Sequence, residues 1–584
     1  MPSVVRAVGA VIAALSLAAC AAIPSSGPVR QGQEQPLAPE EAGVPFIAEP
    51  PHPGASPAEI VAGFLRANAD FSGDHEIARL FLAPNASQRW RPGAGTVVYE
   101  VLPALRIEPA STGTVVVTGS QVATIDAEGS YRRAAVDTEL GRSFDLRMVD
   151  GEWRIAGLAD GLLIRVADVD EVFRHVSLYF LAPSGATLVP DPVLLPQLPG
   201  LATKVVNRLL RGPTAALRGA VRTAFPQGTE LEVQSVPVEN GTAFVRLNEA
   251  VRRADEDARQ QLSAQIVWTL KQLGSDIESV RITFANDEPI TTGVNADQPR
   301  DAWDTFDPDG LRGPVSPYAV REGVVGRLLG EQEFEPVPGA AGSGSLDLRT
   351  PGVSLDGSRL AAVTDEGSSL VVVGLEDGAR AQPVATGTDL SKPSWDPLGN
   401  LWWVERAGGG LFVLPSGGTR PVPVVLPDLP VGPLQKVAVA RDGARIALVA
   451  GTGRETTTMV GAIAGSDQLD GDRTPEAAVS VSGAYVVLPR LSSVTDVAWA
   501  DADTLLTVGE FDAVPSPPMY VTTDGYQMLE IGSQEQLVSL AAAPPLRPQE
   551  NPLVGATPRG RLWTYVIGTG WQRLGPGRDP AYPG

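Results

Sequence analysis

The chain has 584 residues, which is longer than one hydrophobic core usually serves, so its length predicts roughly three to four domains. The 62 glycines and 52 prolines indicate many turns, and a turn-rich chain is expected to be rich in β-structure. The 68 acidic residues outnumber the 46 basic ones, for a formal net charge of −22. Binding to nucleic acid through its phosphates is therefore disfavoured, because such binding needs a basic surface.

The N-terminus has the pattern of an export signal. Residues 7–19 form an apolar run after Arg6, too short to cross a bilayer core of roughly 30 Å as a helix but suited to a signal peptide. Residues 17–20, Leu-Ala-Ala-Cys, match the bacterial lipobox, in which small residues admit the signal peptidase and the thiol receives a diacylglycerol. We therefore predict a signal peptide over residues 1–19, and S-diacylglycerol and N-acyl groups such as palmitate at Cys20.

Cys20 is the only cysteine of the chain, so no intramolecular disulfide can form. Two or three acyl chains would anchor the protein stably to the cell membrane. No later run approaches the roughly 18 apolar residues of a membrane-spanning helix, so we expect the rest of the chain at the extracytoplasmic face. Residues 20–55 combine the lipidated cysteine with many prolines and no apolar period, which predicts a tether.

A first α+β domain is expected over residues 56–174. Ser56-Pro57-Ala58-Glu59 is a capping-box pattern that predicts a helix start. Alternating strands follow at 114–125, 143–149 and 152–158, and Asp150-Gly151 between the last two suits a type I′ hairpin turn.

A helix followed by a curved antiparallel sheet resembles the cone of the NTF2-like fold. Such a cone can hold a small ligand. Core packing is nevertheless the expected role of Phe144, Met148 and Trp153.

A second α+β domain is expected over residues 175–292. Strands at 176–180, 243–247 and 280–284 alternate with a helix at 201–210 and a long helix that carries Leu262, Ile266, Leu270 and Leu273. Three separated strings, at residues 209–213, 223–229 and 265–270, resemble the GerMN domain of spore-germination proteins. That family is known for protein association in the envelope, and the resemblance supplies no catalytic residues.

After a linker expected at residues 293–314, a weak repeat predicts a C-terminal β-propeller over residues 315–584. Each unit has an entering strand, a turn and a returning apolar strand, and the turns carry Asp356, Asp396, Asp442 and Asp501. A last unit near residues 557–563 lacks the aspartate. The intervals suit a propeller of about six four-stranded blades, while a β-sandwich with coincidental turns stays an alternative. The fold class is thus α+β and all-β multidomain.

A search for catalytic and metal-binding patterns gives no candidate residue. The histidines His52, His75 and His175 are scattered, so neither a zinc site nor a standard triad is indicated, and no Walker A or Gly-x-Ser-x-Gly motif occurs. We expect His75, between two acidic residues, to be a solvated helix start.

Two acidic stretches, residues 307–310 and 467–472, lack the spacing of a calcium loop, so exposed turns are expected there. Paired carboxylates for glycoside hydrolysis stay open, because their separation is a distance in space. Cys20 is the one predicted site. No catalytic residue, cofactor or metal is expected.

The order of lipobox, NTF2-like region, GerMN domain and propeller, ending in residues 581–584, Ala-Tyr-Pro-Gly, resembles the LpqB lipoprotein family of actinobacteria. The resemblance implies a non-enzymatic accessory of the Mtr two-component system. Such an accessory contacts the extracytoplasmic domain of the sensor histidine kinase and influences envelope homeostasis and cell division. Two alternatives remain: a cell-wall glycan-processing enzyme with carboxylates in the propeller, and a carrier of a small or lipidic ligand in the cone.

Overall fold

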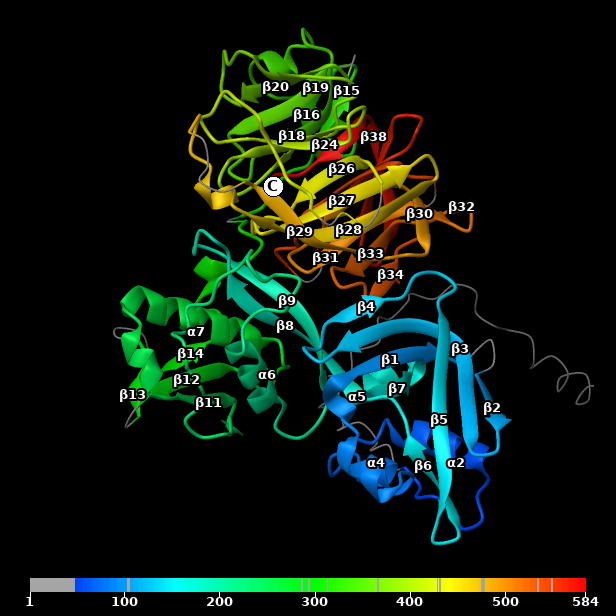
Figure 1. Cartoon of the computed structure of the whole chain (residues 1–584). Coiled ribbons are helices and arrows are strands. Elements are labelled where there is room, and N and C mark those ends of the chain that lie inside the picture. The colour runs from blue at the N-terminus through cyan, green and yellow to red at the C-terminus, as the bar shows by residue number, and fades with distance from the viewer. Residues whose placement is uncertain are drawn as a thin grey trace, which may run out of the picture. The chain divides into compact units, whose positions relative to one another are not determined.

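The computed structural model describes residues 48–101, 105–284, 287–291, 295–311, 313–364, 367–427, 429, 432–473, 478–532, 535–547 and 550–584. Cys20, the expected signal peptide and most of the expected tether lie outside these residues. Two α+β regions are followed by an all-β region (Figure 1). The predicted multidomain fold class is confirmed.

The first region is a short helical segment followed by one curved sheet (Figure 1). The sheet has the strand order β6-β5-β3-β1-β7, and β2 and β4 also pair with β3. All pairings are antiparallel except that of β1 with β7. The elements are α2 (Pro57–Ala67), α3 (Glu76–Leu80), α4 (Pro84–Arg89), η1 (Pro92–Ala94), β1 (Gly95–Glu100), β2 (Arg106–Ser111), β3 (Thr114–Asp126), β4 (Tyr131–Arg133), β5 (Glu139–Val149), β6 (Glu152–Gly157), β7 (Leu162–Arg165), η2 (Val166–Asp168) and α5 (Val169–Val172).

Local sequence signals account for the ends of these elements. The Glu59 carboxylate accepts from the Ser56 backbone N–H at 2.7 Å, and the Ser56 hydroxyl accepts from the Glu59 N–H at 3.4 Å, so the capping box is confirmed. Asp150 and Gly151 have φ of 51° and 82°, the left-handed pair that a type I′ turn between β5 and β6 requires.

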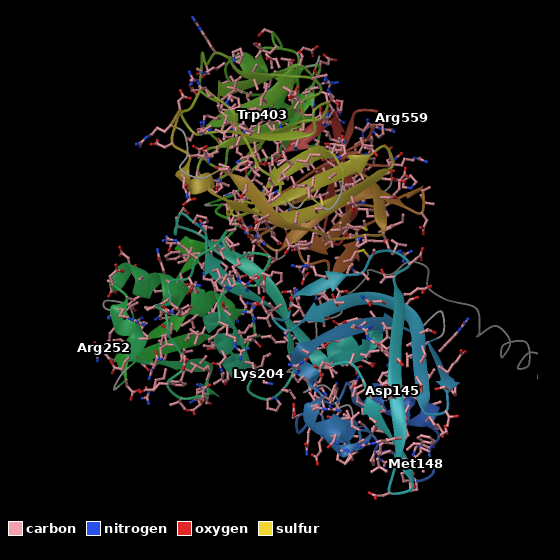
Figure 2. The ribbon with its side chains drawn as sticks, in the orientation of Figure 1. Asp145, Met148, Lys204, Arg252, Trp403 and Arg559 are labelled. Atoms are coloured by element: carbon pink, nitrogen blue, oxygen red, sulfur yellow. The ribbon has the colours of Figure 1, made fainter. Side chains whose placement is uncertain are left out.

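Aromatic side chains fill the core between α2 and the sheet. The Phe64 ring lies 5.3 Å from that of Trp90 and 6.0 Å from that of Phe144, each in an edge-on arrangement. Phe144 is therefore a core residue, as predicted. The expectation for Met148 is wrong, because its side chain lies near the hairpin end of β5 (Figure 2) and is 52% exposed. Trp153 is half-buried.

The second region combines a long hairpin, two main helices and a small sheet (Figure 1). β8 pairs with β9 along its whole length, and the parallel strands β11 and β12 are connected by α7. The elements are β8 (Phe173–Leu181), β9 (Leu188–Pro196), α6 (Leu201–Leu210), β10 (Val238–Glu239), β11 (Thr242–Leu247), η3 (Glu249–Arg253), α7 (Glu256–Lys271), β12 (Ser279–Phe284), β13 (Glu288–Pro289), β14 (Asp297–Pro299) and η4 (Asp304–Phe306).

The segment expected as a linker, residues 293–314, differs in the structure. β14 pairs with β12, and Trp303 is 7% exposed within the core of the second region. The Trp268 indole N–H donates to the Trp303 carbonyl at 3.0 Å, and the Trp303 indole N–H donates to Gln298 at 2.7 Å. Part of this segment thus belongs to the second hydrophobic core.

The all-β region consists of consecutive antiparallel sheets, the blades of a propeller, numbered here in chain order. Its elements are β15 (Tyr318–Arg321), β16 (Val324–Gly330), β17 (Glu333–Pro336), η5 (Ala340–Gly342), β18 (Leu348–Val353), β19 (Arg359–Thr364), β20 (Ser369–Gly374), β21 (Gln382–Thr386), β22 (Ser394–Trp395), β23 (Leu401–Glu405), β24 (Gly410–Leu414), β25 (Val422–Pro423), β26 (Leu434–Val439), β27 (Arg445–Thr452), β28 (Glu455–Ala464), η6 (Ser466–Gln468), β29 (Ser480–Val486), β30 (Leu491–Trp499), β31 (Thr504–Phe511), β32 (Val514–Pro515), β33 (Met519–Thr522), β34 (Met528–Glu530), β35 (Ser539–Ala542), β36 (Leu553–Ala556), β37 (Arg561–Val566), β38 (Gly570–Pro576) and β39 (Arg578–Ala581).

The blades close into a ring of six in the part of the chain that is described. Blade one has the order β17-β16-β15-β39, so the last strand completes the first blade. The innermost strands β39, β18, β22, β26, β30 and β35 each contact the next, and β35 contacts β39 again. A separate apolar cluster lies between each neighbouring pair of blades. The predicted six-bladed propeller is confirmed.

The aspartates of the sequence repeat hold the turns after the innermost strands. One Asp396 oxygen accepts from the N–H groups of Leu398 and Asn400, at 3.0 and 2.9 Å. The other accepts from the Asn400 amide and the Trp402 indole, at 2.8 and 3.0 Å. Asp356 and Asp442 bind their own turns in the same way, so the repeat reflects turn stability.

Candidate functional site

The residues that sequence analysis singled out are not brought together. Cys20 lies outside the described residues, so its acylation stays a prediction. His52 is exposed, and His75 and His175 lie in different regions. Within the described ranges no group of three histidine or acidic side chains is placed to hold a metal ion. In the same ranges no helix is long and apolar enough to cross a membrane.

The expectation that His75 is solvated is wrong. His75 does precede a helix, α3, but it is 5% exposed and has a left-handed φ of 61°. Its ring centroid lies 4.6 Å from that of Phe71 and 5.8 Å from that of Trp90. The acidic residues on either side of His75 in the sequence give no sign of these contacts. Burial lowers the pKa of His75 by disfavouring the charged imidazole, although neighbouring Asp74 opposes the shift.

His175, on β8, forms a buried pair with Asp524 of propeller blade five. The His175 Nε2 lies 2.8 Å from the Asp524 Oδ2, and the side chains are 17% and 1% exposed. Burial opposes a charge on either group. Burial is the largest single influence, but the hydrogen bond and the charge attraction with neighbouring groups together outweigh it, so that the pKa of His175 is raised and that of Asp524 is lowered.

Asp524 was missed by sequence analysis, although a local signal exists. Asp524-Gly525 forms the turn between β33 and β34, and the Asp524 Oδ1 accepts from the Tyr526 N–H at 3.0 Å and from the Thr522 hydroxyl at 2.7 Å. The Asp524 Oδ1 thus stabilises its own turn, as the aspartates of the propeller repeat do, and the Oδ2 is available to His175. The turn is readable from the sequence, but its partner is not.

Further contacts gather around this pair. The Tyr526 ring stacks 5.1 Å from His175 and meets Tyr131 of β4 edge-on at 5.1 Å, and its hydroxyl donates to Asp170. Arg133, also on β4, donates to the carbonyls of Gly525 and Tyr526. The β33–β34 turn therefore contacts both α+β regions.

A second contact joins the β3–β4 loop to the second region. The Gly129 carbonyl accepts from the Leu194 N–H at 2.8 Å, as in a sheet. Arg208 on α6 donates to the Glu128 carbonyl at 2.8 Å, and Arg218 lies 3.0 Å from the Glu128 carboxylate. The described domains are thus linked by polar contacts in addition to the chain itself.

A cluster of buried acidic side chains lies where blade five meets the second region. The Ser177 hydroxyl donates to Asp503 at 2.7 Å, and Arg445 lies 3.8 Å from the other Asp503 oxygen. Burial raises the pKa of Asp503 to about 6 and that of Asp309 to about 7. Residues 307–310 are thus not the exposed acidic turn that was expected, whereas Asp467 and Asp472 are exposed as expected.

A cleft of about 880 Å³ opens between blades five and six and the first region. Four tyrosines line it, Tyr131, Tyr520, Tyr526 and Tyr565. Tyr520 donates to the Asn551 side chain at 2.5 Å, and burial raises its pKa to about 12, so its hydroxyl stays protonated.

The rim of the cleft is apolar, and acidic residues outnumber basic ones in its lining. Met528, Leu529 and Ile567 are 43%, 63% and 50% exposed. Asp170, Asp501 and Glu550 also line the cleft. Large apolar side chains gathered at a cleft are typical of a binding surface.

The propeller axis holds two of the four lysines of the chain. Lys436 lies 2.8 Å from Asp496, and Lys392 donates to the Pro580 carbonyl at 2.8 Å. The remaining space there is about 60 Å³, and Ala581, Tyr582 and Gly584 line part of it. The axis is thus filled by internal contacts.

Comparison with known proteins matches each described region to a family. "Lipoprotein LpqB, N-terminal domain" matches residues 50–170, "Sporulation and spore germination" matches residues 177–291, and "Lipoprotein LpqB beta-propeller domain" matches residues 323–583.

Among named relatives, the chain is similar to Lipoprotein LpqB of Thermobifida fusca, with 30% identity covering 100% of this chain and 99% of the relative. It is also similar to Lipoprotein LpqB of Streptomyces coelicolor, with 31% identity covering 100% of this chain and 97% of the relative. Among solved structures, the first GerMN domain of the sporulation protein GerM from Bacillus subtilis aligns with 22% of this chain and 98% of its own, at 23% identity and a TM-score of 0.19.

Proposed function

Because the chain belongs to the LpqB lipoprotein family, we propose that it is a lipid-anchored, non-enzymatic binding protein of the extracytoplasmic membrane face. Its proposed partner is the extracytoplasmic domain of the Mtr sensor histidine kinase, whose output in envelope homeostasis and cell division it modulates. The Mtr assignment comes from the family resemblance.

One observation carries the binding role: the cleft beside blades five and six has an exposed apolar rim. Met528, Leu529 and Ile567 are exposed to water. A partner that covers them lowers the free energy of the complex, because apolar surface is removed from water. A propeller also presents a broad rigid face. Acylation of Cys20 would confine the protein to the partner's membrane face, so even a weak contact gains from a raised effective concentration.

The test combines a binding titration with crosslinking in the living cell. Full-length protein purified in detergent is titrated with the purified external domain of the kinase, and crosslinked partners are identified by mass spectrometry. We expect saturable binding and recovery of the kinase. Absence of both, together with unchanged kinase output in a deletion strain, would reject the signalling role.

The rival roles make different predictions. A glycan-processing enzyme, with carboxylates such as Asp501 and Glu550 in the cleft, would release soluble products from purified wall material. A carrier would retain a small or lipidic ligand, visible by native mass spectrometry of protein taken from its own membrane. The packed ring faces of Phe64, Trp90 and Phe144 favour core packing over a ligand in the first region.

A further inference from the structure

We propose that the cleft beside blades five and six binds an extended peptide segment of a partner protein, in which basic and apolar residues share every second position and so lie on one face. This inference rests on the proposed function in one respect: the segment belongs to a protein partner. The shape, apolar rim and charge of the cleft each point to this occupant.

The shape of the site favours an extended chain. β34, with Met528 and Leu529, is the outermost strand of blade five, and among described strands none pairs with its free edge. An unpaired strand edge offers backbone N–H and C=O groups to an incoming peptide, which then adds a strand. Residues of an added strand point alternately to its two faces, so basic and apolar side chains that are two positions apart both face the cleft.

The rim favours apolar side chains in that peptide. Leu529 is 63% exposed, Ile567 is 50% exposed and Met528 is 43% exposed, and all three line the cleft. The flexible Met528 side chain adapts to ligands of different shape. Tyr520 and Tyr565 also line the cleft, and aromatic rings attract basic side chains.

The charge of the lining favours basic side chains. Asp170, Asp501 and Glu550 line the cleft. Among the described lining residues, Arg133 is the only cation, and its guanidinium donates to the backbone carbonyls of Gly525 and Tyr526. Glu550 forms a weak ion pair with Arg547 at 3.9 Å, because the Arg547 side chain is 78% exposed. A net negative charge therefore remains for a ligand.

Two other occupants fit less well. A neutral glycan would stack on the tyrosines and donate its hydroxyls to the carboxylates, but it would leave the apolar rim uncovered and the negative charge unbalanced. A second copy of this chain would bring a further formal charge of −22 to an acidic cleft. A basic and apolar peptide uses all three features.

The experiment measures binding of a labelled peptide, acetyl-Leu-Thr-Arg-Thr-Val-Thr-Lys-amide, to the full-length protein in detergent by fluorescence anisotropy. Two further probes are the same peptide with glutamate at both basic positions, and chitotetraose measured by calorimetry. The variants are Leu529→Asp at the rim and Glu550→Gln in the lining. The matched control is Val514→Asp, because Val514 is 64% exposed in the same blade but does not line the cleft.

We expect one peptide to bind per protein and Leu529→Asp to weaken binding at least about tenfold, because a charge replaces an apolar contact. Glu550→Gln should weaken binding about threefold, and Val514→Asp should leave it unchanged. Raising the salt concentration from roughly 50 to 500 mM should weaken binding, because the attraction is between exposed charges. Equal binding of the glutamate peptide, preferential binding of chitotetraose, or equal loss with Val514→Asp would overturn the proposal.

The kinase domain separates this inference from the proposed function. If the domain binds the wild type and the Leu529→Asp variant equally, the cleft inference fails and the proposed function stands. If the peptide binds in the predicted way but the kinase domain does not bind at all, the cleft inference stands and the proposed partner is wrong.

Discussion

The His175 Nε2 lies 2.8 Å from the Asp524 Oδ2, and this contact joins residues that are 349 positions apart in the chain. The contact connects the β8–β9 hairpin to the β33–β34 turn of blade five, which also contacts the first region. Removing one member of a buried pair leaves the other without its partner. The pair is therefore a sensitive point of the domain interface.

We expect Asp524→Asn to lower stability by about 3 kcal/mol near pH 6. Asparagine keeps the turn acceptor for the Tyr526 N–H but removes the charge that faces His175. The pKa of His175 is raised in the folded protein, so its stabilising contribution is fully present below its ordinary pKa and lost as pH rises through the raised value. The cost measured by urea unfolding should thus shrink as pH rises from about 6.5, the ordinary histidine value, through the raised one.

Asp389→Asn is the control for that variant. Asp389 is 60% exposed in an ion pair with Arg406, and such pairs contribute roughly 0 to 1 kcal/mol. A pH-independent loss in Asp524→Asn, or an equal loss in Asp389→Asn, would contradict the role of the pair.

Asp309→Asn should stabilise the protein, and by at least about 1 kcal/mol more at pH 8 than at pH 5. One Asp309 carboxylate oxygen is buried without a hydrogen-bond partner, and burial raises its pKa to about 7. The folded protein holds the Asp309 proton more tightly than the unfolded protein does. The free energy of unfolding therefore falls as pH rises from about 4, the ordinary pKa of a carboxyl group, towards 7. Denaturant midpoints at both pH values test this, with exposed Asp467→Asn as the control.

Arg441→Lys should lower the stability of the propeller by about 2 to 4 kcal/mol. The Arg441 guanidinium is buried and donates to the carbonyls of Trp499, Ala542 and Pro583, which belong to different parts of the ring. A single ammonium group cannot reach all three. Thermal unfolding should show the loss, while Arg473→Lys, with a side chain 83% exposed, should leave the midpoint unchanged.

Ser56→Ala should cost the first helix about 1 kcal/mol, because the capping hydroxyl of α2 is lost. Hydrogen exchange of the Glu59 and Ile60 amides in the full chain should accelerate locally. Ser368→Ala, at an exposed position of the propeller, should leave those amides unchanged. Unchanged exchange in Ser56→Ala would show that the hydroxyl contributes nothing.

Cys20→Ala should move the protein from the membrane fraction to the medium or leave an unprocessed precursor. The lipobox offers only this thiol for acylation, since the chain has no other cysteine. Cell fractionation and mass spectrometry of the mature N-terminus measure both outcomes. Normal processing with retained membrane attachment would refute the lipid anchor.

Local chemistry explains why so much of the fold could be predicted from the sequence. The capping box at Ser56, the Asp150-Gly151 turn and the repeat aspartates act on residues a few positions away, and the structure confirms each. The LpqB family resemblance is confirmed as well.

What could not be predicted depends on distant contacts. His75 is flanked by acidic residues in the sequence, but Phe71 and Trp90 bury its ring in the structure. The cleft is lined by residues from Val98 to Ile567, and no local pattern reveals that they meet. Met148 follows the alternation of a buried strand but lies where β5 extends beyond the core.

The pairing of β39 with β15 also sets the order in which the propeller can form. Blade one begins near residue 318 but lacks its innermost strand until residues 578–581 have been made. During synthesis, the first blade to emerge is thus the last to be completed, and β15 keeps an unpaired edge meanwhile. Such an edge readily pairs with other chains, so the nascent protein passes through an aggregation-prone stage that ends only with its final strand.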